Sequence, residues 1–314
     1  MVSNLMDARH YWPALRAIVT ALAAFATLRL GRGGLLKSPT RLEQICVVVN
    51  ISNETEGDKR IWLPRFHRRV VCTEVEDPFA ASDEPPPYYF EGVSHKKALQ
   101  NWEDTRTWRK ENHIGTILRR PPKKHDLIRS LFPTSLYQHD RAGNVVMVEK
   151  WGEVDVHRIR RLGIPFDEII NTYMYDTEWL WRIANPHPED KITLIMDLKD
   201  VSFETFTAWD TMRLIRKRIE IGCNHYPNRA SHLLIVNVPH FFASVYRFAE
   251  PILSSETKKK ITILTQEDVA RGKMTKFIAP KNLLPEYGGK CRVPFGASSL
   301  DIKLKRFAKK PIKL

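Results

Sequence analysis

The sequence predicts an α/β fold in which helices cover both sides of a mostly parallel β-sheet. Residues 191–198 (KITLIMDL), 232–238 (HLLIVNV) and 260–264 (KITIL) are short, almost continuous apolar segments. Segments with apolar residues at helical spacing lie between them. Strands of a parallel sheet are buried on both faces, so they are apolar throughout instead of alternating with polar residues. We therefore expect a mostly parallel sheet with helices on both sides.

The first 40 residues differ from the rest of the chain. Residues 1–40 are basic and contain one acid, Asp7, and an apolar run at 18–28 (IVTALAAFATL). Eleven apolar residues are too few to span a bilayer. The alternatives are a targeting segment, a short anchor and an N-terminal helix that docks on the protein.

Residues 41–92 give few structural signals and end in an acidic, proline-rich segment at 74–91. Pro78 and the three prolines at 85–87 exclude a regular helix or a central strand there. We expect an exposed linker.

A helical pattern begins at residue 93 and continues to about residue 120. Ala98, Trp102, Thr105 and Trp108 recur at three- and four-residue spacing with charged residues between them. This pattern predicts the end of a small helical N-terminal module, in which the part before residue 93 is degenerate.

The main domain is expected at 125–291. Its first clear strand is 145–148 (VVMV), preceded by a turn at 140–143 (DRAG). Two later segments have helical spacing. One carries an apolar stripe at Trp209, Met212, Ile215 and Ile219; the other carries Phe241, Phe242, Val245, Phe248 and Ile252.

The remaining segment, 292–314, is predicted to be a basic C-terminal tail. Its last twelve residues contain no acid and carry Lys303, Lys305, Arg306, Lys309, Lys310 and Lys313. The alternatives for these cations are docking on an anionic membrane and a solvated tail.

Charge narrows the class of partner. Fifty Lys and Arg residues against 36 Asp and Glu residues give a formal net charge of +14. Such an excess favours either nucleic acid or an anionic membrane surface. Because no nucleic-acid-binding motif accompanies the charge, we expect no nucleic-acid partner.

The residues give no support for catalysis or for a cofactor. Nucleotide-binding glycine motifs and a GxSxG elbow are absent, and the histidines and the four cysteines lack zinc-site spacing. Asp197 ends a predicted strand, where catalytic residues often lie, but capping of the following loop is the alternative that we favour. We expect a protein without enzymatic activity, metal or cofactor.

Five segments, in order, resemble the CRAL-TRIO lipid-binding family. They are 98–118 (ALQNWEDTRTWRKENHIGTIL), 132–156 (FPTSLYQHDRAGNVVMVEKWGEVDV), 194–202 (LIMDLKDVS), 225–253 (HYPNRASHLLIVNVPHFFASVYRFAEPIL) and 284–291 (LPEYGGKC). Within this family, the phosphatidylinositol transfer proteins are the most similar group. The resemblance implies a cleft that holds one lipid and a mobile helix that closes it.

The resemblance also implies site residues. Thr257 and Lys260 match the family's phosphate-contacting Thr and Lys, and Asn228 replaces an acidic residue of its YPER motif. The family's choline-lipid positions are apolar here and fall on Leu136, Met147, Ile192 and Leu194. We expect these four, together with the phenylalanine-rich helix, to form the lipid pocket and lid.

The resulting hypothesis is a monomeric lipid-binding and lipid-transfer protein, cytoplasmic and peripherally associated with membranes, that favours phosphatidylinositol. Two alternatives are kept. One is a carrier of an apolar small molecule such as a sterol, a tocopherol-like compound or a retinoid. The other is a lipid-sensing module that targets membranes without transferring lipid.

Overall fold

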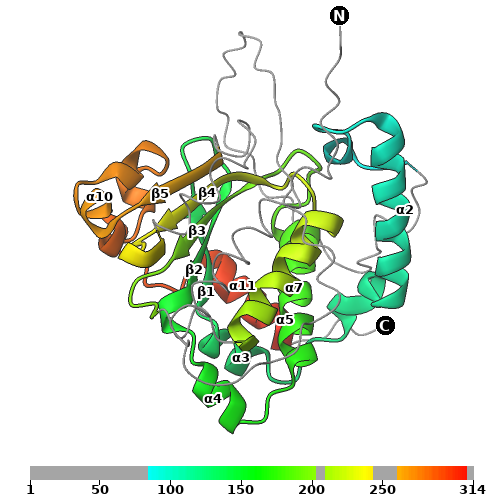
Figure 1. Ribbon diagram of the computed structural model, residues 1–314, viewed down its shortest axis with the longest axis horizontal. Coiled ribbons are helices and arrows are strands. Elements are labelled where there is room, and N and C mark those ends of the chain that lie inside the picture. The colour runs from blue at the N-terminus through cyan, green and yellow to red at the C-terminus, as the bar shows by residue number, and fades with distance from the viewer. Residues whose placement is uncertain (1–83, 203–208, 243–259, 310–314) are drawn as a thin grey trace, which may run out of the picture.

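The computed structural model describes residues 84–202, 209–242 and 260–309, and its centre is a five-stranded sheet in the order β1-β2-β3-β4-β5 (Figure 1). The strands are β1 (Thr134–His139), β2 (Val145–Lys150), β3 (Ile192–Asp197), β4 (Ala230–Val236) and β5 (Ile261–Leu264). β1 pairs with β2 in antiparallel fashion, and the other neighbours are parallel. The predicted fold class is confirmed.

One face of the sheet is covered by long helices. These are α5 (Phe166–Trp179), which continues into the π-helical turn η5 (Leu180–Ala184), and α7 (Trp209–His225). The shorter helices α3 (His125–Leu131) and α4 (Val156–Arg161) lie at the lower end of this layer in Figure 1. A large buried cluster joins helix side chains such as Tyr175 and Trp179 to the sheet.

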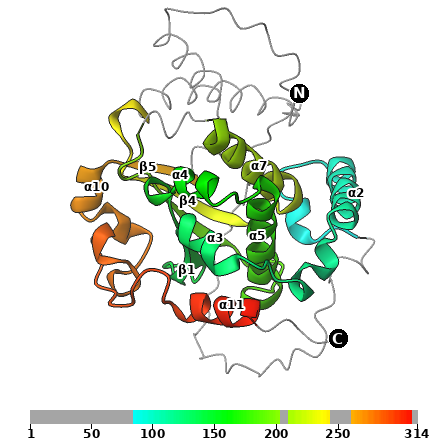
Figure 2. The same cartoon turned by 90° about the horizontal axis from the view of Figure 1, so that it is seen from below.

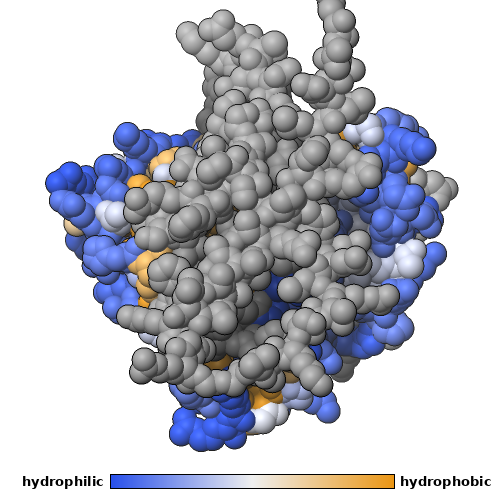
Figure 3. Space-filling view, in the orientation of Figure 1, coloured by the Kyte–Doolittle hydropathy of each residue, from blue (hydrophilic) through white to orange (hydrophobic). Residues whose placement is uncertain are grey.

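The opposite face is covered by the segment that follows β5. It contains α10 (Gln266–Ala270) and three short 3-10 helices at Lys273–Lys276, Pro280–Asn282 and Pro285–Tyr287. Side chains of alternate strand residues, such as Ile195 and Leu234, are buried here against Met274 and Tyr287. Figure 1 shows the sheet between the two layers, which is the predicted arrangement. The outer faces of α2 and α10 are hydrophilic (Figure 3).

The predicted N-terminal helix is α2 (His95–Glu111), followed by η3 (Ile114–Arg119). Ser94 caps α2, since its hydroxyl accepts a hydrogen bond from the Lys97 amide. The expected apolar stripe points inward, and Ala98 and Trp102 are almost completely buried.

The expectation of an exposed linker is wrong for the part of 74–91 that the structure describes. The chain forms a short 3-10 helix, η2 (Pro87–Tyr89), and Tyr88 and Tyr89 are buried against Trp102. Tyr89 donates a hydrogen bond to Thr105 Oγ1 (3.0 Å), and its phenol oxygen lies 3.1 Å from the carbonyl oxygen of His225. The prolines exclude long regular structure here, yet the segment is a packed strap over α2 and α7.

The expectation of a basic tail at 292–314 is also wrong for its central part. Residues Ser299–Lys309 form α11, which packs beside β1 and α3 (Figure 2). Leu304 and Asp301 are fully buried. Asp301 accepts hydrogen bonds from Arg129 (3.0 Å), from the Leu136 amide (3.2 Å) and from the hydroxyl groups of Ser135 and Ser298.

Several predictions concern residues outside the described part of the chain. These are the N-terminal segment 1–40, most of 41–92, and the candidate site residues Thr257, Val245, Phe248, Ile252, Lys310 and Lys313.

Candidate functional site

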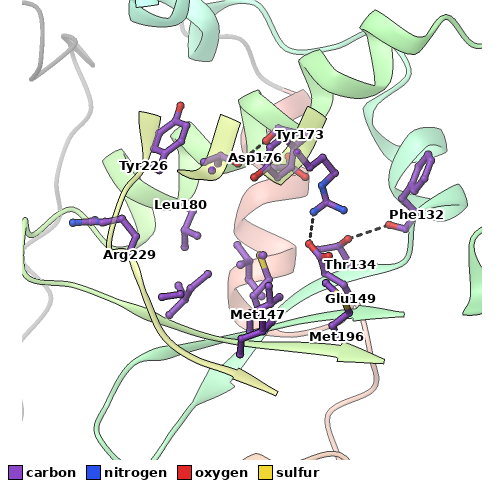
Figure 4. Close-up of a pocket in the computed structure, with 18 of the residues that line it drawn as sticks. Phe132, Thr134, Met147, Glu149, Tyr173, Asp176, Leu180, Met196, Tyr226 and Arg229 are labelled. Atoms are coloured by element: carbon purple, nitrogen blue, oxygen red, sulfur yellow. Dashed lines mark hydrogen bonds and ion pairs between the residues drawn. The ribbon is translucent and has the colours of Figure 1, made fainter. Parts of the chain in front are cut away.

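A cavity of about 360 Å³ lies between the sheet and the layer of α5 and α7. Its floor is formed by side chains of β1 to β5 that point toward the helices, and its opposite wall by residues of α5, η5 and α7. Figure 4 shows the row of apolar side chains between the two layers, with Leu180 and Met147 near the middle. The π-helical turn η5 places both Leu180 and Trp181 in the wall, and such turns often occur at functional sites.

All four residues predicted to form the apolar wall line this cavity. They are Leu136, Met147, Ile192 and Leu194. Ladder pairing explains why they lie together, because Leu136 is opposite Met147 on β1 and β2, and Met147 pairs with Leu194 on β3. Residues two apart on a strand share a face, so Ile192 lies on the same side as Leu194.

One end of the cavity is basic. Arg229 is 6% exposed, and its guanidinium group lies 3.9 Å from the ring centre of Trp181 and 4.8 Å from that of Tyr88. It donates hydrogen bonds to the carbonyl oxygens of Pro188 (2.6 Å) and His187 (3.3 Å). Among the residues that the structure describes, no carboxylate lies within salt-bridge distance, and burial lowers the pKa of Arg229. An anion in the cavity would compensate this charge.

Lys260, predicted from the sequence, lines the cavity at the same end, directly before β5. Burial and, to a lesser extent, the positive charge of Lys191 lower the pKa of its ammonium group to about 8, against the opposing effect of the Glu91 carboxylate. Lys191 is itself paired with Glu91 at 3.3 Å. Lys260 is therefore a cation whose surroundings disfavour its charge until an anion arrives.

Asn228, the third predicted head-group residue, also lines the cavity. Its amide nitrogen donates hydrogen bonds to the carbonyl oxygens of Tyr88 (2.8 Å) and Glu91 (3.2 Å), so half of the side chain fastens the strap. Its Oδ1 atom is buried and has no hydrogen-bond partner among the described residues. Only the oxygen atom is therefore left to contact a ligand. At this site Asn228 can act as a hydrogen-bond acceptor and not as a donor.

A second polar point, which the sequence did not indicate, lies on the cavity wall away from Arg229. Arg218 on α7 pairs with Glu149 on β2, and the other Glu149 oxygen accepts a hydrogen bond from Trp151 Nε1 (3.0 Å). The Arg218 guanidinium group also lies 4.5 Å from the ring centre of Tyr173. Burial opposes its charge, but Glu149 and Tyr173 together outweigh burial and raise the pKa of Arg218. In Figure 4 Glu149 and Arg229 lie at opposite sides of the apolar row.

Of the expected lid residues, the structure describes Phe241 and Phe242. Phe242 is half-buried against a core cluster that includes Trp151, Ile235 and Val238, and it is not among the described residues that line the cavity. Phe241 is also not among the described residues that line the cavity. Neither phenylalanine contributes to the described lining, and the role of this helix as a lid stays a prediction.

Four of the six residues predicted to dock on a membrane belong to α11, and Lys310 and Lys313 lie outside the described residues. Lys303 and Arg306 are exposed on its outer side. Lys305 Nζ donates to the carbonyl oxygen of Gly296 (2.9 Å), and Lys309 forms a 3.0 Å ion pair with Asp126. The cations thus surround a docked helix instead of lying on a loose tail.

Asp197 has the capping role that was favoured over catalysis. It accepts hydrogen bonds from the Lys199 amide (2.9 Å), from Asn237 (2.8 Å) and from the phenol group of Tyr287 (2.8 Å). In the described ranges no group of three or more His, Cys, Asp or Glu side chains could hold a metal ion. Across those same ranges, no helix combines the length and apolarity that crossing a membrane requires.

Comparisons with known proteins agree with this geometry. The family model of the CRAL/TRIO domain matches residues 130–289. The SEC14 cytosolic factor of Candida glabrata is 26% identical over 214 residues, which cover 65% of this chain and 68% of that protein. The phosphatidylinositol/phosphatidylcholine transfer protein SFH9 of Arabidopsis thaliana is 23% identical over 205 residues, 63% of this chain and 35% of that protein.

The chain therefore spans about two thirds of the SEC14 factor and about a third of SFH9. Among solved structures, the crystal structure of Sfh5 matches with a TM-score of 0.50 and 18% identity, covering 68% of this chain and 78% of that one. This match supports the fold alone. Because the family model covers half of the sequence, the chain belongs to the CRAL/TRIO domain family.

Proposed function

We propose that this protein binds one phospholipid in the cavity and exchanges it between membranes. The observation that carries the proposal is a long apolar cavity with buried cations at one end. Apolar walls suit acyl chains, because each buried methylene group contributes about 0.8 kcal/mol. Arg229, which has no ion pair within salt-bridge distance among the described residues, and Lys260, whose charge burial disfavours, suit a phosphate. The names of the SEC14 and SFH9 relatives support lipid binding of this kind.

Phosphatidylinositol is the lipid that we propose. The phosphate would lie between Lys260 and Arg229, and Asn228 Oδ1 would accept a hydrogen bond from a hydroxyl group of the inositol ring. Thr257, which lies outside the described residues, stays a predicted second contact of the phosphate. The apolar side chains of Leu136, Met147, Ile192 and Leu194 argue against a choline head group at the family's second position.

Exchange requires the lipid to enter and leave at a membrane surface. We propose docking of the basic face of α11, with Lys303 and Arg306 near the anionic head groups and Ile302, which is 41% exposed, as an apolar contact. A basic side chain near an anionic surface contributes about 1 kcal/mol. The helix carrying Phe241 and Phe242 would open, admit the lipid and close.

The four apolar wall residues also favour a second candidate, a carrier of a sterol or another apolar small molecule. Such a ligand would leave Arg229 and Lys260 without an anion, which is the reason for ranking it second. A lipid-sensing module would bind the same phospholipid but would not release it to a second membrane.

Identification of the lipids that co-purify with the intact protein tests the proposal. Mass spectrometry should find phosphatidylinositol as the main bound species, and its amount should fall in Lys260→Met but not in Lys273→Met, a lysine of the opposite sheet face. A sterol in place of phospholipid would support the second candidate. Vesicle assays with labelled phosphatidylinositol separate the remaining roles, because a sensing module binds the lipid without carrying it to acceptor vesicles.

A further inference from the structure

We infer that Arg218 donates a hydrogen bond to an uncharged oxygen atom in the acyl chain of the bound lipid. The inference rests on the proposed function, because it takes the phosphate to lie at Arg229 and Lys260. It adds a second recognition point to a cavity whose lining is mostly apolar. The ligand class is a phospholipid whose acyl chain carries a hydroxyl, keto or epoxide oxygen near its middle.

The position of the oxygen follows from strand register. Ala230, next to Arg229, is paired with Ile192 at the start of β3, whereas Glu149 is paired with Met196. Four residues separate Ile192 from Met196, and a parallel strand rises about 3.3 Å per residue, so the two polar points are about 13 Å apart along the floor. The glycerol ester groups lie closer than this to the phosphate of a phospholipid. A mid-chain atom is the part that reaches Arg218.

The type of group follows from the hydrogen bonds at Arg218. A guanidinium group has five N–H donors and no acceptor. Glu149 accepts from one terminal nitrogen, and Nε is buried without a partner among the described residues. Both Glu149 oxygens are already occupied, one by Arg218 and one by Trp151. Arg218 has N–H groups that Glu149 does not use, whereas each Glu149 oxygen already accepts one hydrogen bond, so this wall favours a hydrogen-bond acceptor.

The charge of that group follows from the pairing. Arg218 and Glu149 together are neutral, and both line the cavity. A carboxylate in the ligand would gain Arg218 but would be repelled by Glu149 at nearly the same distance. A neutral oxygen gains the hydrogen bond without that repulsion. At Arg229 no carboxylate is adjacent among the described residues, so the two ends of the cavity have different preferences, anion at one and neutral acceptor at the other.

The test compares two phosphatidylinositols that differ in one atom. One carries an oleoyl chain, and the other carries the same chain with a hydroxyl group at carbon 7. Binding of each to the intact protein is measured by displacement of a fluorescent phospholipid. A hydrogen bond from a charged donor shifts a binding constant by about tenfold or more, so the hydroxylated lipid should bind at least about tenfold more tightly.

Variants test whether the preference for the hydroxylated lipid depends on Arg218. Arg218→Met with Glu149→Leu removes both charges, so no unpaired ion is left, and it should bind the two lipids equally. Arg218→Lys keeps the pair but loses the planar fork, and the preference should fall. Arg213→Met is the matched control, since Arg213 lies on the same helix but over the ring of Phe166, outside this cavity. It should keep the preference of the unmodified protein.

The outcomes separate the two proposals. Equal affinity of the unmodified protein for both lipids would overturn the role of Arg218 and leave the proposed function standing. A preference that survives in the double variant would also overturn it. If neither phosphatidylinositol displaces the probe, the proposed function fails and this inference fails with it.

Discussion

Arg109 on α2 donates hydrogen bonds through both terminal nitrogens to the two carboxylate oxygens of Glu178 on α5, each at 2.9 Å. Both side chains are buried, and the phenol group of Tyr226 donates a third hydrogen bond to Glu178 at 2.6 Å. Tyr226 and Arg229 belong to one short segment before β4. This pair therefore joins the N-terminal helix to the wall of the cavity at its basic end.

Replacement of Arg109 by Met should be strongly destabilising. It would leave the buried Glu178 carboxylate with Tyr226 and with Arg182, whose Nη1 lies at 3.4 Å. Removal of one member of an isolated buried ion pair costs about 3–5 kcal/mol, and because these partners remain we expect a loss near the lower end, about 3 kcal/mol. Urea unfolding should show this loss in the free energy of unfolding. Arg106→Met is the control on the same helix, because Arg106 pairs with the exposed Glu103 at 3.5 Å and such pairs contribute about 0–1 kcal/mol. Equal losses in both variants would contradict the structural role of the buried pair.

Binding of phosphatidylinositol should weaken as pH rises above about 8. Burial lowers the pKa of Lys260 to about 8, below its ordinary value, so the side chain is charged below that pH and neutral above it. A phosphate favours the charged form, and the affinity should fall by up to about tenfold per pH unit above 8. Lys260→Arg should bind with little change between pH 7 and 9, since the guanidinium group stays protonated. A similar decline in that variant would assign the pH effect to another group.

The sheet and the apolar floor of the cavity could be predicted because they depend on local sequence. Residues of β3 and β4 are buried on both faces, so the apolar pattern of each segment shows a strand without knowledge of its neighbours. The floor residues follow from the two-residue periodicity of strands. Lys260 was found because a family motif marks its position.

The missed features depend on partners far away in the chain. The strap was taken for a linker because its prolines and acids suggested exposure, whereas Tyr89 is buried by partners that include Thr105 and His225. The Arg218–Glu149 pair joins residues 69 positions apart, and each alone looks like a surface charge. The basic residues of α11 obscure its apolar positions, of which Leu304 is fully buried and Leu300 and Phe307 pack against the core.

Leu304→Ala should destabilise the domain by about 2–5 kcal/mol, the range for a fully buried leucine whose removal leaves a cavity. Ile302→Ala on the same helix is the matched control and should change the free energy of unfolding little, because Ile302 is 41% exposed. Thermal or urea unfolding measures both. If Leu304→Ala unfolds like the unmodified protein, α11 does not contribute to the core.

Two glycines should respond in opposite directions to replacement by alanine. At Gly152 a Cβ atom would lie 1.6 Å from the carbonyl oxygen of Lys199, so Gly152→Ala requires the backbone to move and should lower stability. At Gly222, within α7, the nearest atom is Tyr173 Oη at 3.6 Å, which is ordinary contact. Alanine is favoured over glycine inside a helix by about 0.5–1 kcal/mol, so Gly222→Ala should raise the free energy of unfolding by about that amount.

The Gly222 variant also tests the cavity, because Gly222 is one of its lining residues. An added methyl group on α7 narrows the space between the helix and the floor while the fold becomes more stable. We therefore expect Gly222→Ala to bind phosphatidylinositol more weakly than the unmodified protein at equal or higher thermal stability. Weaker binding together with lower stability would point instead to a distorted helix. Unchanged affinity would mean that the bound lipid does not pass this part of the wall.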